Sequence, residues 1–352
     1  MPLLARMVGT PLSVDIRPGA VAGLAPLLAD RRISSGGHVA IAVGPGQGEE
    51  IAAMLGPKLE NADIRMVEGG TLEGAMELAA HLRNGFYDAL VGIGGGRTLD
   101  VAKHAATAVG LPLVAVATNL SHDGIASPVA SLEMEGRKGS YGVQLPVAVF
   151  VDLDYVRRSP PEMRSSGIGD VVSNLSAIAD WRLAEEVRGE VVDGVAVTFA
   201  RSAAEAVLDR ADGIDDEAFL TALADALVLS GLAMAMAGSS RPCSGGDHEI
   251  VHAIDHLFPD VGRHGELAGM GALFTSYLRG AGDLVERLDA CLTRHGLPRV
   301  PGDVGLSEEK FAEAVLHAPR TRPDRYTILE HLDLGPEEVR RHVRAYVDAL
   351  GR

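Results

Sequence analysis

The sequence predicts an α/β domain built on a parallel sheet, followed by a domain made of helices. In the first part of the chain, short β-branched apolar runs alternate with helical patterns, which is typical of a parallel sheet covered by helices on both faces. From Ile168 onward, helical periodicity dominates and strand-like runs almost vanish. We therefore expect two domains, at residues 1–160 and 161–352.

The strands of the first domain are predicted from five short apolar runs. Each run is too short for a buried helix, and breaker or polar residues follow it. The predicted strands are His38–Val43, Ile64–Val67, Ala89–Ile93, Leu113–Val116 and Ala148–Asp152. The predicted helices between them are residues 48–56, Leu72–Asn84 and Thr98–Val109.

The helical domain is predicted to begin after Ser159-Pro160-Pro161, which breaks the preceding pattern. Four segments in it carry clear helical periodicity. They are Val171–Glu186, Val195–Ala211, Phe219–Met236 and Leu267–Leu278.

Composition limits the possible functions. The chain has 352 residues, is 47% hydrophobic and 23% charged, and carries a net charge of −16. This composition supports packed cores, whereas the negative charge disfavours binding to nucleic acids and anionic membranes. The sequence has no signal-peptide pattern and no uninterrupted apolar run of bilayer length, so we expect a cytoplasmic protein without membrane insertion. For Cys243 and Cys291, free thiols are favoured over one disulfide.

A triple glycine, Gly94-Gly95-Gly96, follows the third predicted strand and leads into a predicted helix. Glycine lets a ligand approach the backbone closely, and a helix N-terminus offers unpaired N–H groups and a positive dipole end to a phosphate. The pattern is neither GxGxxG nor a Walker motif. A plain tight turn is the alternative, but the position after a buried strand favours phosphate binding.

A dense polar loop, residues 117–128, follows the fourth predicted strand. In open α/β sheets, ligands bind beyond the carboxyl ends of the strands. The hydroxyl groups and the carboxylate of this loop suit contacts to ribose, nicotinamide or substrate. A capped surface loop is the alternative.

Histidines cluster at His248, His252 and His256, which are four residues apart, and His264 follows at the start of the next helix. Residues at i and i+4 share a helical face. Two imidazoles from adjacent helices and one carboxylate can hold a divalent metal and leave a position open for substrate. A solvated helical face is the alternative. Asp170 is a candidate carboxylate, although an N-cap role explains it equally well.

Taken together, these segments resemble the glycerol-1-phosphate dehydrogenases of the iron-containing alcohol dehydrogenase and dehydroquinate synthase-like superfamily. The resemblance covers most of the chain and rests on residues 94–103, 121–128, 166–170, 179–184 and 238–242, and on the segments of His248 and His264. Three departures stand out. The family usually has Lys at Arg97, Pro-Thr-Ala-Ala at residues 117–120 and Glu at Asp247.

The resemblance implies a dehydroquinate synthase-like fold and a role for each matching residue. It implies that the dinucleotide is bound by Gly94, Gly95, Gly96, Arg97, Thr98, Thr118, Ser121 and Ser127. It implies that Asp123 and His252 contact substrate. It implies that Asp170, His248 and His264 bind one divalent metal, with zinc as the first choice and nickel or iron as alternatives.

The implied reaction is the reversible reduction of dihydroxyacetone phosphate to sn-glycerol 1-phosphate by a homo-oligomer that uses NAD or NADP. Residues Val43–Gln47 offer no acid to the ribose 2′-hydroxyl, which predicts tolerance of both cofactors. A proton would come from water or from His252, because imidazole titrates near neutrality.

Three alternatives remain open. The first is a dehydrogenase of another small polyol, alcohol or aldehyde. A cyclase of the dehydroquinate synthase type is disfavoured because basic residues are sparse around Asp123 and Asp170. A non-catalytic binding protein is disfavoured because all three proposed metal ligands are present.

Overall fold

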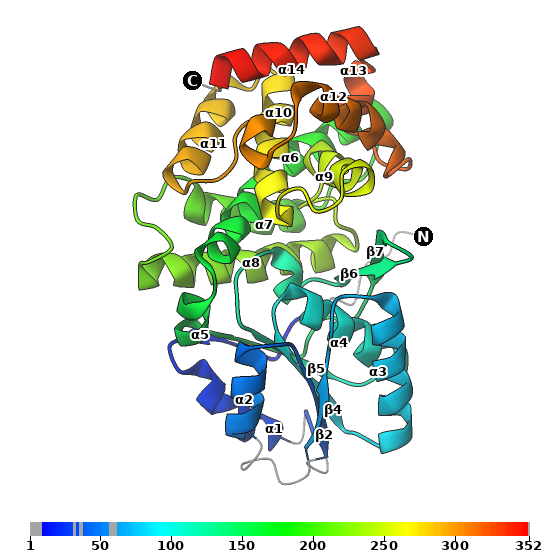
Figure 1. Ribbon diagram of the computed structural model, residues 1–352, viewed down its shortest axis with the longest axis vertical. Coiled ribbons are helices and arrows are strands. Elements are labelled where there is room, and N and C mark those ends of the chain that lie inside the picture. Colours follow the sequence, from blue (N-terminus) through cyan, green and yellow to red (C-terminus); the bar gives the residue numbers. More distant parts are fainter. Residues whose placement is uncertain (1–8, 31–32, 35–37, 56–61, 351–352) are drawn as a thin grey trace. The chain divides into compact units, whose positions relative to one another are not determined.

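The computed structural model describes residues 9–30, 33–34, 38–55 and 62–350, and they form two compact units (Figure 1). The first unit contains the chain up to Asn119 together with Gly124–Ser159. The second contains Leu120–Asp123 and the chain from Pro160 onward. A four-residue loop after a strand of the first unit is therefore part of the second. The functions expected for the two parts stay predictions.

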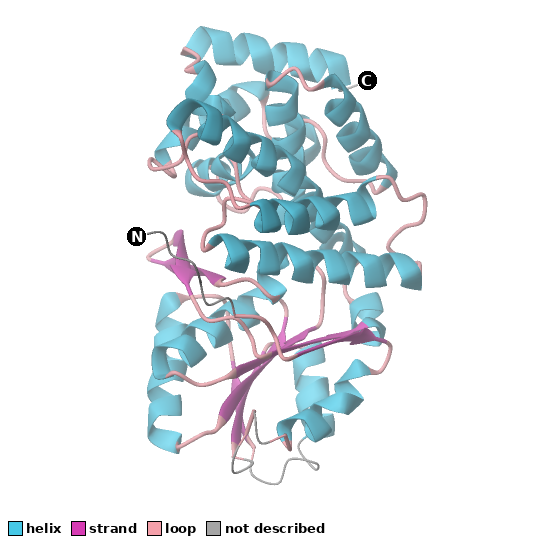
Figure 2. Ribbon diagram, turned by 180° about the vertical axis from the view of Figure 1, so that it is seen from behind, coloured by secondary structure: helices cyan, strands magenta, loops and turns pink. Residues whose placement is uncertain are grey.

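The first unit is built on six parallel strands (Figure 2). Their order across the sheet is β1 (Ser13–Arg17), β8 (Ala148–Asp152), β5 (Leu113–Ala117), β4 (Ala89–Gly94), β2 (Val39–Val43) and β3 (Asp63–Met66). The five predicted strands are confirmed. The edge strand β1 was missed because its sequence, SVDIR, mixes charged and apolar residues and is only partly buried.

Helices cover both faces of this sheet, as predicted. Helices α1 (Leu24–Leu28) and α2 (Gln47–Leu55) cover one face, and α3 (Leu72–Gly85) and α4 (Gly96–Val109) cover the other. Alternate residues of β2 enter different cores: Val39, Ile41 and Val43 pack in one, and Ala40 and Ala42 in the other. Gly56, the predicted end of α2, lies outside the described residues.

The strand order reverses at β2. The chain passes from β2 to its neighbour β3, and then continues with β4 on the opposite side of β2 and with β5 and β8 beyond it. The carboxyl ends of β2 and β4 therefore flank a topological switch point, where open α/β sheets bind ligands. A hydrogen bond from Gly44 N to Ile93 O, 2.9 Å long, joins the two strand ends.

Further elements of this unit were missed by the sequence analysis, including helix α1. Strands β6 (Val129–Met134) and β7 (Arg137–Gly142) form an antiparallel hairpin, and α5 spans Leu153–Arg158. The hairpin turns at Glu135-Gly136, where both residues have positive φ, 52° and 76°. Such turns match the twist of the flanking strands. Strand β7 is exposed and polar, and in β6 only Ala130 and Leu132 are buried, at alternate positions, so no continuous apolar run marks the hairpin.

The second unit is all-helical, as predicted (Figure 1). Its α-helices are α6 (Pro161–Arg188), α7 (Gly194–Leu208), α8 (Glu217–Ala237), α9 (Gly246–Leu257), α10 (His264–Leu278), α11 (Gly282–Arg294), α12 (Glu308–His317), α13 (Ile328–Leu332) and α14 (Pro336–Leu350).

The start of α6 corrects the prediction for the Pro160-Pro161 segment. The helix begins at Pro161, ten residues before the predicted Val171. Proline is favoured at the first position of a helix, where its missing N–H would have had no partner. The segment therefore ends the strand pattern and begins the helix.

Helix α8 is long and apolar enough to cross a membrane by length and composition alone, contrary to the expectation of no such segment. However, 61% of its most apolar stretch is buried within the protein. Core helices pass the same test, so this helix is weak support for a membrane span.

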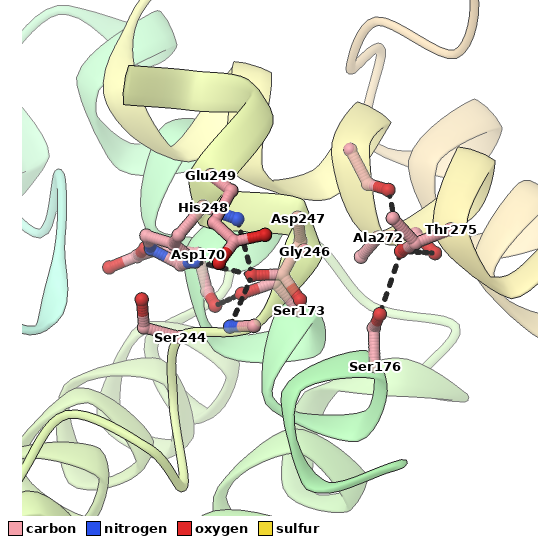
Figure 3. Close-up of polar contacts among 12 residues, drawn as sticks. Asp170, Ser173, Ser176, Ser244, Gly246, Asp247, His248, Glu249, Ala272 and Thr275 are labelled. Atoms are coloured by element: carbon pink, nitrogen blue, oxygen red, sulfur yellow. Dashed lines mark hydrogen bonds and ion pairs between the residues drawn. The ribbon is translucent and has the colours of Figure 1, made fainter. Parts of the chain in front are cut away.

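Helices α6 and α10 meet through glycines that leave no room for side chains. A Cβ atom on Gly169 would lie 2.2 Å from Gly265 O, and one on Gly265 would lie 1.9 Å from Ser166 O. One turn farther along, a Cβ atom on Gly269 would lie 3.0 Å from Gly169 Cα. Beyond these contacts, Ser176 and Thr275 share a buried hydrogen bond of 2.7 Å between their hydroxyl groups (Figure 3).

We predict that Gly169→Ala destabilises the protein. Helix propensity alone would favour Ala by about 1 kcal/mol. The overlap with the α10 backbone cannot relax by side-chain rotation, so we expect a net loss of roughly 2–3 kcal/mol, or about 5–10 °C in Tm. The measurement is thermal unfolding followed by circular dichroism.

The matched control is Gly194→Ala at the start of α7, where an added Cβ atom meets nothing within 4 Å. We expect this variant to keep or slightly raise the Tm. An unchanged Tm for Gly169→Ala would show that the glycine contact does not constrain the two helices.

Candidate metal centre and cofactor site

Three side chains converge within the helical unit. Asp170 Oδ1 lies 3.5 Å from His248 Nε2 and 3.6 Å from His264 Nε2, and the three ligand atoms all lie within 4.8 Å of one another. Tetrahedral zinc with bonds of roughly 2.0–2.1 Å separates its ligand atoms by about 3.3 Å. The donor set and its spacing therefore fit a divalent ion with one open position.

Each of the three ligands comes from a different helix. Asp170 is the tenth residue of α6, His248 is the third of α9, and His264 is the first of α10. The N-cap alternative for Asp170 is wrong, because the residue lies within α6 and is 3% exposed. The glycine contact between α6 and α10 involves Gly169 and Gly265, which adjoin Asp170 and His264 in the sequence.

Asp247 orients the His248 ring (Figure 3). His248 Nδ1 lies 2.6 Å from Asp247 Oδ1, and because a carboxylate only accepts, Nδ1 must carry a proton. That leaves Nε2 to face Asp170. The same Asp247 oxygen accepts from the backbone N–H groups of Gly245 and His248, at 3.1 and 2.7 Å. A carboxylate behind a metal-binding histidine is the usual way to set its tautomer.

Asp180 anchors this end of α9 from α6. Its buried carboxylate accepts from Gly246 N at 2.8 Å, from Ile328 N at 2.7 Å and from Arg279 Nη2 at 2.8 Å. Asp180 belongs to the Ala179–Ala184 segment on which the family resemblance partly rests. The segment thus ties α9, α10 and the chain before α13 to α6.

The charges of the triad support one another. Burial alone would raise the pKa of Asp170, but the hydrogen bond from His248 and the charges of His264, His248 and His122 lower it. Burial would lower the pKa of His248, yet Asp170 and Asp247 raise it above its usual value. Asp170 is therefore ionised at neutral pH, as a metal ligand must be.

The loop Leu120–Asp123 packs against α6 within the same unit. Asp123 N donates to Asp170 Oδ2 at 2.8 Å, and Ser166 Oγ donates to Ser121 O at 3.0 Å. The His122 and His264 rings have centroids 6.3 Å apart. Asp123 is thus beside the triad. Its backbone N–H binds Asp170 Oδ2, whereas Asp170 Oδ1 faces the two histidines.

His252 lies one turn beyond His248 on α9 and contacts an arginine. Arg322 Nη2 donates to His252 Nε2 at 2.9 Å. Burial and the charge of Arg322 hold the pKa of His252 well below its usual value. This lowered pKa and the bond from Arg322 disfavour the near-neutral titration expected for His252, and its role stays a prediction. His256 is apart from the triad and pairs with His317 at 3.0 Å.

Sequence reasoning missed Arg322 and Arg325, which come from the segment before α13. Arg322 and Arg325 both donate to Ser240 Oγ, at 3.4 and 2.9 Å. Basic residues are sparse near Asp123 and Asp170 in the sequence, but the fold brings Arg322 to His252 across 70 residues. The motif that contains Ser240, residues 238–242, was the available signal.

The glycine turn of the first unit forms a cradle at the switch point. A Cβ atom on Gly44 would lie 2.3 Å from Thr98 Oγ1, and one on Gly94 would lie 2.8 Å from the same atom. A Cβ atom on Gly95 would lie 2.5 Å from Asn119 Nδ2. Gly95 is also the N-cap of α4 and has no side chain to cap it. The N-terminus of α4 thus suits a phosphate.

The other predicted cofactor residues of this unit differ in their surroundings. Thr118 N donates to Gly94 O at 3.0 Å, which joins the end of β5 to the glycine turn. Arg97 is exposed, and its side chain covers Gly70. Ser127 is buried, and its hydroxyl donates to Val129 O at 3.0 Å while Lys103 Nζ lies 3.4 Å away. Ser121 belongs to the helical unit. All these cofactor roles stay predictions.

Comparison with known proteins relates the chain to one group of enzymes. A family model described as iron-containing alcohol dehydrogenase matches residues 15–160. A protein of Methanothrix thermoacetophila named glycerol-1-phosphate dehydrogenase [NAD(P)+] is 35% identical, with 91% of each chain covered. The protein of that name from Thermofilum pendens is 44% identical, with 70% of this chain and 71% of the relative covered.

Solved structures show the same fold. A probable glycerol dehydrogenase from Sinorhizobium meliloti aligns with a TM-score of 0.77 and 23% identity, covering 97% of this chain and 98% of the other. Glycerol dehydrogenase from Schizosaccharomyces pombe aligns with a TM-score of 0.76 and 20% identity, covering 97% of this chain and 90% of the other. The predicted fold class is confirmed.

We predict that Asp247→Asn weakens metal binding about 10- to 100-fold, because loss of the carboxylate removes the charge that fixes the His248 tautomer. The measurement is zinc affinity by competition with a chromogenic chelator. Asp225→Asn, at an exposed position of α8, is the control and should bind zinc normally. Equal affinities for the two variants would remove Asp247 from the metal centre.

Proposed function

Because the chain belongs to the glycerol-1-phosphate dehydrogenase family, we propose that it transfers hydride reversibly between NAD(P)H and the carbonyl carbon of dihydroxyacetone phosphate, giving sn-glycerol 1-phosphate. The observation that carries the proposal is the Asp170, His248 and His264 triad, with its ligand-atom spacing and its supporting carboxylate. Two relatives that bear the enzyme's name are 35% and 36% identical over 91% and 93% of this chain.

In this proposal the triad holds one divalent ion, with zinc as the first choice. When bound, such an ion supplies a Lewis acid for the ketone oxygen and the alkoxide that develops from it. Asp170 would use Oδ1, because Oδ2 already accepts the Asp123 N–H. His248 would use Nε2, because Nδ1 is committed to Asp247. Both ligands are thus held in place before a metal arrives.

The cofactor would bind at the switch point of the first unit. The glycine turn and the uncapped N-terminus of α4 would hold the pyrophosphate, with Thr98 and Thr118 beside it. The nicotinamide ring carries the hydride, so the protein's contribution is to position it. Asp123 and His252 would contact the substrate. We assign the proton to water, because His252 is neutral at pH 7 and its Nε2 accepts from Arg322.

We predict that activity requires the metal triad. Purified protein should contain about one divalent metal per chain and should oxidise NADH or NADPH with dihydroxyacetone phosphate. Chelation should abolish this activity and added zinc should restore it. His264→Ala should lose both the metal and at least about 1000-fold in kcat/KM.

His256→Ala, on the exposed face of α9 outside the triad, is the control and should keep the metal and the activity. The substrate test is a panel of ketones that contains dihydroxyacetone phosphate, dihydroxyacetone and simple aldehydes. Full activity of chelated protein would refute the metal centre. Preference for an unphosphorylated substrate would refute the assigned reaction.

We also predict that the enzyme uses NADH and NADPH with kcat/KM values within about tenfold of each other. Residues Val43–Gln47 carry no carboxylate to hold a ribose 2′-hydroxyl or to repel a 2′-phosphate, and the carboxylate of the nearby Glu49 accepts from Gly46 N at 3.4 Å. The measurement is steady-state kinetics with each cofactor at saturating substrate. A preference of more than about 100-fold for NADH would contradict this prediction.

A further inference from the structure

A pair of arginines lies beside the metal centre within the helical unit. Arg322 and Arg325 come from the segment between α12 and α13, and their guanidinium groups meet at Ser240 Oγ, which accepts from both. Two guanidinium groups that reach one oxygen atom have the spacing of a phosphate site, because each presents several N–H groups to a tetrahedral oxyanion.

Other parts of the helical unit hold this pair in place. Arg325 Nη1 donates to the backbone oxygen of Ser244, on the loop that leads into α9. Arg241 pairs with Glu190 and donates to Tyr326 O at 3.1 Å, and so ties down the segment that carries both arginines. The arginines thus have fixed positions before any ligand binds.

The charge of the pair favours an anion. The hydrogen bonds of Arg325 reach neutral oxygen atoms of Ser240 and Ser244. Burial and the charges of Arg322 and Arg241 lower the pKa of Arg325 to about 10, against the opposing charges of Glu249 and Asp247, so Arg325 remains a cation at pH 7. Its guanidinium group can therefore donate charge-assisted hydrogen bonds to an oxyanion.

The distance to the metal triad suits a small phosphorylated ketone. Arg322 donates to His252, which is one helical turn from the ligand His248, or about 6 Å along α9. The His248 and His264 rings have centroids 5.1 Å apart, and His252 follows His248 by one turn of α9. In dihydroxyacetone phosphate, the phosphorus is three bonds from the carbonyl carbon. One small molecule can therefore reach both groups.

We propose that Arg322 and Arg325, aligned by Ser240, bind the phosphate of the substrate and so select phosphorylated over unphosphorylated ketones. This inference rests on the proposed function, which it deepens by naming the residues that set specificity. Arg322 donates to His252, so a phosphate bound by Arg322 would lie next to His252.

The test measures kcat/KM for dihydroxyacetone phosphate and for dihydroxyacetone in the metal-loaded enzyme. Arg322→Gln and Arg325→Gln should each lose roughly 10- to 100-fold with the phosphorylated ketone, mainly through KM, and less than about threefold with dihydroxyacetone. Arg325→Lys should recover part of the loss. Inorganic phosphate should inhibit dihydroxyacetone reduction competitively in the unmodified enzyme and weakly in both Gln variants.

Arg320→Gln is the matched control, because Arg320 is exposed on the same segment and its charge acts on His317. It should leave all these values unchanged. The KM values for NADPH and NADH should also be unchanged in the Gln variants. A rise confined to NADPH would assign the arginines to the 2′-phosphate of the cofactor and overturn the proposal.

Equal losses with both ketones would indicate a purely structural role and overturn the proposal as well. If the unmodified enzyme reduces dihydroxyacetone phosphate and the variants keep their preference for it, this inference fails while the proposed function stands. If the unmodified enzyme reduces no phosphorylated ketone, both fail.

Discussion

The candidate metal centre depends on the direct contact between the backbones of α6 and α10. Gly169 and Gly265 bring the helices close enough that any side chain at either position would overlap the other helix. Asp170 and His264 are the residues that follow and precede these glycines. The spacing of these two side chains is therefore set by a contact between backbones, which yields less than a contact between side chains. A wider helix crossing would separate the carboxylate from the imidazole.

The third ligand is positioned by carboxylates instead of glycines. Asp180, on α6, accepts from Gly246 N, the first N–H group of α9, and Asp247 accepts from Gly245 N, from His248 N and from the His248 ring. Asp247 therefore binds backbone N–H groups at the start of α9 and is also the partner of a candidate metal ligand. The family usually has Glu here, but the aspartate carboxylate reaches the backbone N–H groups of Gly245 and His248 and the ring of the same histidine. The departure from the family pattern therefore leaves the arrangement intact.

Much of the fold could be predicted from the sequence, because buried parallel strands and long helices leave strong apolar patterns. The strands without such patterns, β1 and the β6–β7 hairpin, were missed because they are exposed at an edge or on one side. The candidate ligands were found because His248 and His264 lie close in sequence. Asp170 was assigned as a ligand only through the family resemblance. Its place beside the two histidines follows from the packing of α6, which the sequence does not show.

The arginine pair was not predicted, since Arg322 lies 70 residues beyond His252 and the motif that contains its partner Ser240 does not identify it. Its position also explains how a chain with a net charge of −16 can accept an anionic substrate. Asp170 and Asp247 place two carboxylates at the triad, whereas the nearby Asp180 is paired with Arg279, and a divalent ion would offset the charge of the two carboxylates. The ion and the guanidinium groups would then act at opposite ends of the same small molecule. Metal binding and phosphate binding are thus expected to support each other.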